Sequence, residues 1–165
     1  MGSLNRITIH WTAGSLVACA HDKSCYHFLV EGSGKIIKGD KTPEDNINCN
    51  DGRYAAHCGG GNTGNIGVSM CGMYGFSNRS NSGRYQLTGI QCEATWKLVA
   101  QLCKKYNIPV DAEHVFTHYE FGKKHPNTAS KGKIDIVYLP YQPQIQQDNI
   151  GDFIRNKVSW YMKHI

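Results

Sequence analysis

Two histidines in this sequence follow short apolar segments, where strands could carry them to a common site. His10 lies in RITIHW, and His118 ends VFTH. A polar stretch after His118 closes with Lys133 and Asp135 in the order Lys-Ile-Asp. Two imidazoles and a carboxylate can hold zinc and leave a fourth position for water. The pattern therefore suggests a catalytic metal site formed by His10, His118 and Asp135.

The same residues also have a simpler interpretation. The chain contains 8 histidines, and a histidine at a strand end is more often a surface or hydrogen-bonded residue. Lys133 would then be a solvated cation, and Tyr26 an aromatic residue of a strand that faces the core. His125, in the same polar stretch, is the leading rival ligand. Residue types alone thus leave both interpretations open.

Five segments have the features of β-strands, and they must place these side chains. Residues 6–11 alternate and are followed by the turn-forming TAGS. Residues 25–31 and 35–40 flank Gly-Ser-Gly, which predicts a hairpin. Residues 65–72 follow a glycine-rich run and have apolar or small residues on both faces, which predicts a central strand. Residues 115–118, VFTH, predict a further short strand.

Two segments predict amphipathic helices. Thr88 with Gln91 resembles a capping box, and apolar residues recur at helical spacing from there to Tyr106. The second helix is near the C-terminus, where one face carries Ile150, Phe153, Ile154, Val158 and Tyr161. The fold class expected is α/β, with a single mixed β-sheet flanked by helices. Catalytic groups gather beyond the carboxyl ends of strands in such folds, where His10 and His118 are expected.

Length and composition indicate a globular protein. The 165 residues are 40% hydrophobic and 19% charged, which suits one domain over residues 1–165. No apolar run is long enough to span a bilayer, so no membrane insertion is expected. The N-terminus lacks the pattern of a secretory signal. Seven cysteines without a Cys-x-x-Cys pair predict free thiols in a reducing cytosol.

The charge favours an anionic partner without identifying it. The formal net charge is +5 and the pI about 8.8, which would suit nucleic acid, an acidic membrane or an anionic cell-wall polymer. Lysines and arginines are scattered, and no nucleic-acid recognition motif is present. We therefore expect no nucleic-acid partner.

Five motifs in a fixed order carry a family resemblance. They are ITIHWTAG, CYHFLVEGSGKIIKGD, YAAHCGGGNTGNIGVSM, FTHYE and GKID, and they run from about Ile7 to Asp135. Together they resemble the zinc-dependent N-acetylmuramoyl-L-alanine amidases of the type 2 family, which includes phage endolysins and is similar to peptidoglycan-recognition proteins. The resemblance implies one Zn²⁺ per chain and peptidoglycan as the partner.

The resemblance also implies roles for individual residues. His10, His118 and Asp135 would be the zinc ligands, Tyr26 would lie beside the water that the metal activates, and Lys133 would stabilise the developing negative charge. The groove wall would include His57 and the loop through Asn62. Glu120, two positions after His118, could fix the tautomer of that histidine.

Two departures from the family pattern bear on the mechanism. Many relatives carry a glutamate as general base where this chain has Ser69, and serine cannot act as that base. The role then shifts to Tyr26 and, as an alternative, His57. The loop between His118 and Lys133 is also longer than expected, which leaves three rival cations, although the spacing to Asp135 favours Lys133. Those rivals are Lys123, Lys124 and Lys131.

The function implied is zinc-dependent hydrolysis of the amide between N-acetylmuramic acid and L-alanine in bacterial peptidoglycan. A phage or prophage endolysin would be held in the bacterial host cytoplasm until lysis and would then act on the wall. The alternative is a peptidoglycan-binding recognition module without catalysis. A mere binder needs neither the metal nor Lys133, so the complete residue set favours the enzyme. Oligomeric state is not predicted.

Overall fold

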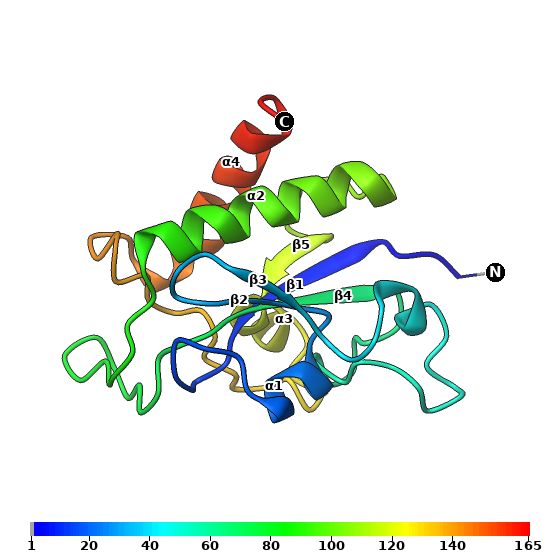
Figure 1. The fold of residues 1–165 in the computed structure, drawn as a ribbon, viewed down its shortest axis with the longest axis horizontal. Coiled ribbons are helices and arrows are strands. Elements are labelled where there is room, and N and C mark those ends of the chain that lie inside the picture. Colours follow the sequence, from blue (N-terminus) through cyan, green and yellow to red (C-terminus); the bar gives the residue numbers. More distant parts are fainter. Residues whose placement is uncertain (1) are drawn as a thin grey trace.

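A mixed five-stranded β-sheet forms the centre of the computed structural model, which describes residues 2–165 (Figure 1). The order across the sheet is β3-β2-β4-β1-β5. Strand β1 pairs in parallel with β4 and β5, and β2 pairs in parallel with β4 but antiparallel with β3. The strands are β1 Arg6–Trp11, β2 Phe28–Val30, β3 Ile36–Lys38, β4 Asn65–Met70 and β5 Val115–Thr117. The predicted hairpin and the central position of residues 65–70 are confirmed.

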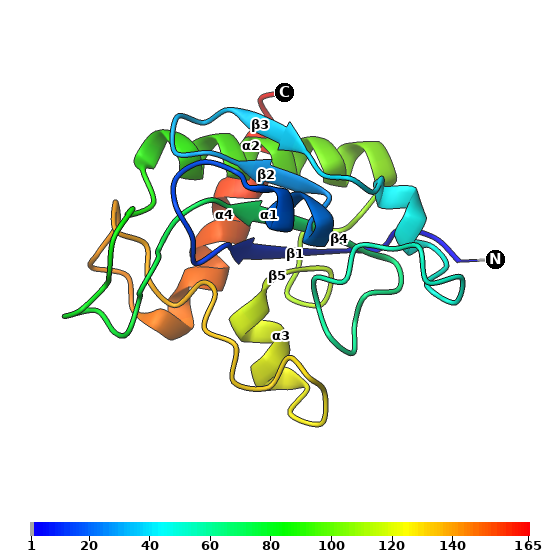
Figure 2. The ribbon, with the colours of Figure 1, turned by 60° about the horizontal axis from the view of Figure 1, so that its bottom comes forward.

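Helices flank the sheet, which confirms the predicted α/β class. In Figures 1 and 2 the long helices α2 and α4 run together on one side of the strands, and the short α1 and α3 lie on the other. The helices are α1 Ala20–Cys25, α2 Gly89–Tyr106, α3 His118–Lys124 and α4 Ile150–Met162, with 3₁₀ turns at Pro43–Asn46 and Gln147–Asn149. Within residues 2–165 none of these helices has the length and apolarity needed to cross a bilayer.

Helix α2 begins and ends where local chemistry favours it. The Thr88 hydroxyl accepts a hydrogen bond from the Gln91 amide N–H at 3.0 Å, and the Gln91 side chain accepts one from the Thr88 N–H at 3.1 Å. This is the predicted capping box. Asn107 ends the helix in the left-handed conformation, with φ 55°, which asparagine tolerates better than most residues. The buried face of α2 packs on α4 and on the sheet.

The alternation of β1 separates the apolar core from the polar centre. Ile7 and Ile9 are fully buried in the large core cluster that includes α2 and α4. Successive side chains of a strand point to opposite faces, so Thr8 and His10 lie on the other face. His10 thereby reaches the end of β1 on the side of the sheet where α1 and α3 lie.

Two details near the candidate residues differ from the sequence predictions. His118 is the first residue of α3 and does not end a strand, because Thr117 caps that helix by accepting a hydrogen bond from the Glu120 N–H at 3.1 Å. The polar stretch after His118 is thus partly helical. Tyr26 does not lie in a strand, because it caps the C-terminal end of the short helix α1, which was not predicted.

Candidate metal centre

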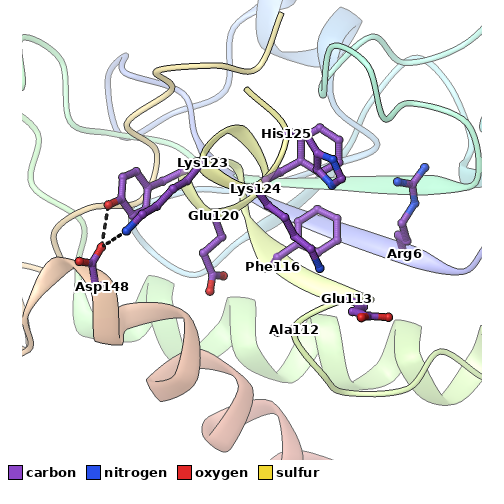
Figure 3. A pocket seen from close by; sticks show the side chains of 11 residues that line it. Arg6, Ala112, Glu113, Phe116, Glu120, Lys123, Lys124, His125 and Asp148 are labelled. Carbon is purple, nitrogen blue, oxygen red and sulfur yellow. Dashed lines mark hydrogen bonds and ion pairs between the residues drawn. The ribbon is translucent and has the colours of Figure 1, made fainter. Parts of the chain in front are cut away.

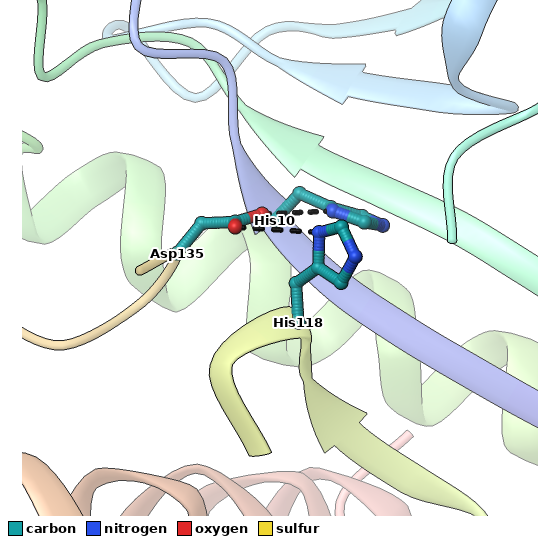
Figure 4. Close-up of side chains that lie close together, drawn as sticks. All are labelled: His10, His118 and Asp135. Carbon is teal, nitrogen blue, oxygen red and sulfur yellow. Dashed lines mark hydrogen bonds and ion pairs between the residues drawn. The ribbon is translucent and has the colours of Figure 1, made fainter. Parts of the chain in front are cut away.

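Three side chains from distant segments meet at one end of β1 (Figure 4). Each of His10, His118 and Asp135 offers one donor atom, and these atoms lie within 4.8 Å of one another. His10 Nδ1 is 2.8 Å from one carboxylate oxygen of Asp135, and His118 Nδ1 is 3.3 Å from the other. The structure therefore brings together the three residues that the sequence suggested as ligands.

Burial makes this cluster electrostatically unusual. Burial lowers the pKa of the His10 imidazole to about 4. Burial also opposes the charge on His118, but the adjacent Asp135 carboxylate outweighs it and raises the pKa of His118 to about 9. Asp135 is itself buried, yet hydrogen bonds from His10 and His118 hold its pKa below the usual value. An ionised carboxylate therefore lies between two imidazoles in a site largely shielded from water.

The donor set fits a divalent metal such as zinc. Two imidazole nitrogens and one carboxylate oxygen are ligands that catalytic zinc sites use, with a further position left for water or substrate. Among the described residues, no fourth histidine, cysteine or carboxylate joins the group. The cluster also opens onto a cleft of about 490 Å³ whose wall includes His57, Tyr26 and Lys133. The residues present therefore fit a metal that remains accessible to a ligand.

Tyr26 and Lys133 line the cleft onto which the metal cluster opens. The ring of Tyr26 is 5.0 Å from that of His10, centroid to centroid, and burial, reinforced by the Asp135 charge, raises the pKa of its phenol. Tyr26 is therefore a neutral hydrogen-bonding group at neutral pH. Lys133 is exposed on the cleft wall. Both predicted side chains thus face the same cleft as the metal cluster.

The three rival lysines do not line this cleft. Lys123 and Lys124 line a separate cavity beside α3, and Lys123 Nζ is 3.2 Å from an oxygen of Asp148. Lys131 is exposed and lines neither space. The preference for Lys133, which rested only on its spacing to Asp135, is thus matched by its position.

The two expected groove residues behave differently from each other. His57 lines the cleft but is buried, and its ring nitrogens contact His10 and the backbone of Asn65. Asn62 is not part of the cleft wall. Its side-chain oxygen accepts hydrogen bonds from the backbone N–H groups of His57 and Cys58, at 3.0 and 2.8 Å. Asn62 holds the loop that positions His57.

The expectation that Glu120 fixes the tautomer of His118 is wrong. The Glu120 carboxylate accepts two hydrogen bonds from the Arg155 guanidinium, at 3.0 and 2.9 Å. The group that contacts His118 Nε2 is the hydroxyl of Ser130, at 3.0 Å. Nothing in the sequence indicated Ser130, since a serine in a polar stretch carries no signal of such a contact.

A second cavity lies on the other side of α3 (Figure 3). It measures about 290 Å³ and is lined by Phe116, Phe121 and a ring of charged side chains that includes Arg6 and Lys124. His125, the rival ligand, packs its ring 4.3 Å from that of Phe121. None of the predicted catalytic or metal-binding residues lines this cavity.

The sequence matches one protein-family model over most of its length. Residues 2–135 match Amidase_2, described as N-acetylmuramoyl-L-alanine amidase. No curated protein matches the sequence.

Several solved structures share the fold at low sequence identity. The hydrolase AmiA of Staphylococcus aureus, solved with its ligand, has a TM-score of 0.59 at 16% identity, over 99% of this chain and 77% of that one. The amidase LysC of Clostridium intestinale URNW has 0.55 at 16%, over 96% and 87%. AmiD of E. coli, solved with an anhydro-N-acetylmuramic acid peptide, has 0.53 at 20%, over 88% and 57%.

Proposed function

Because this chain belongs to the Amidase_2 family of N-acetylmuramoyl-L-alanine amidases, we propose that it hydrolyses, with zinc, the amide between N-acetylmuramic acid and L-alanine in peptidoglycan. The observation that carries the proposal is the buried group of His10, His118 and Asp135, which opens onto a cleft shared with Tyr26 and Lys133. We also propose that residues 1–165 act as one amidase domain.

Side chains of the protein would hold the metal, which activates water, and would stabilise the developing charge. An amide is a poor electrophile and water a poor nucleophile, and a zinc ion, when bound, supplies the Lewis acidity that makes water reactive near neutral pH. His10, His118 and Asp135 would hold it. The Lys133 ammonium would stabilise the negative charge that develops on the scissile carbonyl oxygen, more strongly in the transition state than in the ground state.

Tyr26 takes over the work on the attacking water that a glutamate, as general base, does in many relatives. Ser69 stands at that place, and its buried hydroxyl has no hydrogen-bond partner among residues 2–165. His57 is a poor candidate for the base, because both of its ring nitrogens already have partners. Tyr26 lies beside His10 and keeps its proton, so its hydroxyl can orient the attacking water or relay a proton.

The biological setting proposed is that of a phage or prophage endolysin. Seven free cysteines suit synthesis in a reducing cytoplasm, and a net charge of +5 favours association with an anionic cell wall. AmiD, which shares the fold, was solved with a muramic acid peptide, and this supports the same substrate class here. The enzyme would meet peptidoglycan only after lysis.

Digestion of purified sacculi tests the proposal. We expect new L-alanine amino groups without new reducing sugar ends, and mass spectrometry of the products should find free stem peptides. EDTA should stop the release and added zinc should restore it. Binding to sacculi without release would instead favour a recognition module, and new reducing ends would place the cleavage in the glycan.

A further inference from the structure

The second ring nitrogen of His10 belongs to a directed chain of hydrogen bonds. His10 Nε2 is 3.0 Å from His57 Nδ1, and His57 Nε2 is 2.8 Å from the backbone carbonyl oxygen of Asn65. A carbonyl oxygen only accepts, so His57 must carry its proton on Nε2. A neutral His57 then accepts at Nδ1, and His10 must donate from Nε2. In a neutral His10 the lone pair then lies on the remaining nitrogen, Nδ1, which faces Asp135, so a hydrogen bond from Nδ1 to Asp135 in the metal-free protein needs a second proton on the ring.

His118 is held in the same way by different groups. His118 Nε2 is 3.0 Å from the Ser130 hydroxyl oxygen, and that hydroxyl donates to the backbone carbonyl of Gly59 at 2.7 Å. The Ser130 hydroxyl has one proton and donates it to the Gly59 carbonyl, so its oxygen accepts a hydrogen bond from His118 Nε2–H. A neutral His118 therefore also has its lone pair on Nδ1, the nitrogen that faces Asp135. Both chains end on carbonyls of the same glycine-rich segment, at Gly59 and Asn65.

When both histidines are neutral, as a metal requires, three acceptors face one another in the buried centre. Two imidazole lone pairs and a carboxylate repel unless positive charge lies between them. Without a metal, His10 and His118 can each form a hydrogen bond with Asp135 only if Nδ1 carries a second proton. One divalent cation replaces both protons and leaves the outer hydrogen bonds intact. The outer hydrogen bonds thus select the form of each histidine that a metal requires.

Two glycines leave the space that the hydrogen bonds through His57 and Ser130 need. A Cβ atom at Gly67 would lie 2.5 Å from Cγ of His57, so only glycine lets that ring rest against β4. A Cβ atom at Gly59 would lie 2.7 Å from Cβ of Ala129, the neighbour of Ser130. Close backbone approach of this kind is a recurrent role of glycine.

We propose that His57 and Ser130 are positioning residues, which accept the Nε2 protons of His10 and His118 and so direct Nδ1 of both toward a divalent cation. The proposal rests on the proposed function, because it assumes that the centre holds a metal. It gives His57 a role other than forming the groove wall or acting as general base. It also gives a role to Ser130, which the sequence did not single out.

Zinc affinity measured by competition with a chromophoric chelator tests the proposal on the intact chain. His57→Phe keeps an aromatic ring but removes the acceptor, and Ser130→Ala removes the hydroxyl. Each should weaken zinc binding by about 10- to 100-fold, the usual cost of losing such a partner. His57→Asn keeps an acceptor close to the position of Nδ1 and should recover part of the affinity. Ser33→Ala, which removes an exposed hydroxyl from the turn between β2 and β3, should bind zinc like the wild type.

Nitrogen-15 NMR of the zinc-loaded wild type gives a readout that does not depend on any variant folding. His10 and His118 should each carry a proton on Nε2 and bind the metal through Nδ1, and His57 should carry its proton on Nε2. Coordination through Nε2 of either ligand would overturn the proposal. So would unchanged zinc affinity in both His57→Phe and Ser130→Ala. A wild type that takes up no zinc would instead defeat the metal-dependent function itself.

Discussion

The buried centre and the cavity beside α3 contain the same kinds of residues but use them in opposite ways. In the centre, His10, His118 and Asp135 direct their donor atoms at one another, and their outer atoms are held by the surrounding chain. In the cavity, Lys123 and Asp148 pair with each other at the surface. Charges that neutralise one another leave nothing for a ligand, whereas facing acceptors require one. Hydrogen bonds to the outer nitrogens of His10 and His118 therefore distinguish the two regions better than residue type does.

The largest expected effect comes from Asp135→Asn, which keeps the shape but removes the charge between the two imidazoles. Zinc affinity should fall by more than about 100-fold, beyond the range for outer contacts, and peptidoglycan hydrolysis should be lost with it. Metal analysis after gel filtration, paired with an amino-group release assay, measures both. Asp148→Asn is the matched change at the cavity and should leave both unchanged. Equal losses in the two variants would remove the distinction between the regions.

A lysine exchanged in each region separates catalysis from surface charge. Lys133→Ala should lower kcat by about 100- to 1,000-fold, the range for losing one group that stabilises an oxyanion, while zinc content stays the same. Lys124→Ala removes the same charge at the cavity and should retain wild-type kcat. Steady-state kinetics on a soluble muropeptide gives the values. If kcat fell only for Lys124→Ala, the catalytic cation would be Lys124, in the cavity beside α3, and not Lys133.

The Glu120 to Arg155 pair should matter for stability and not for the metal. Arg155→Met would leave the partly buried Glu120 carboxylate without its partner, and unfolding should become easier by about 3 kcal/mol. Urea denaturation measures this change. Zinc affinity of the folded variant should stay within twofold of the wild type, because Glu120 does not contact His118.

Lys157→Met is the control for that change. The Lys157 pair with Glu93 is about one-third exposed, so its loss should cost less than about 1 kcal/mol. Weakened zinc binding in Arg155→Met would restore the link between Glu120 and the metal ligands.

The smallest effect expected is a pH dependence that originates beside the buried centre. Burial lowers the pKa of His27 to about 4 from 6.5, despite its hydrogen bond to Asn46 and the nearby charges of Asp45 and Glu44. The unfolded chain binds this proton more readily, so stability is lost as the pH falls from about 6.5 toward 4. The loss between pH 7 and 5 should be about 2 kcal/mol.

Urea denaturation of His27→Gln at pH 7 and 5 checks this prediction, since the variant should depend less on pH even if it is less stable throughout. His125→Gln, an exposed histidine of the cavity, should keep the wild-type dependence. An unchanged pH dependence in His27→Gln would show that other groups cause the acid loss.

Much of the fold could be predicted because its signals are local. Alternation in residues 6–11 predicts both a strand and the face of His10, and the Thr88 and Gln91 pair predicts the start of α2. Helices α1 and α3 were missed, although Thr117 and Glu120 form a capping box, because a helix of 7 residues within a polar stretch has too few positions for a periodic pattern. The apolar run before His118 also favoured a strand that ends at His118 over a helix that begins there.

The sequence by itself indicated which side chains could hold a metal and which segments would bring them close, because strand alternation depends on neighbouring residues and the order of the motifs can be read along the chain. Only the tertiary structure decided which nitrogens face the centre. That choice depends on Ser130 rather than Glu120 lying behind His118, and on His57 lying behind His10. These contacts join residues 12 and 47 positions apart, and their direction is set by backbone carbonyls whose orientation no residue type encodes.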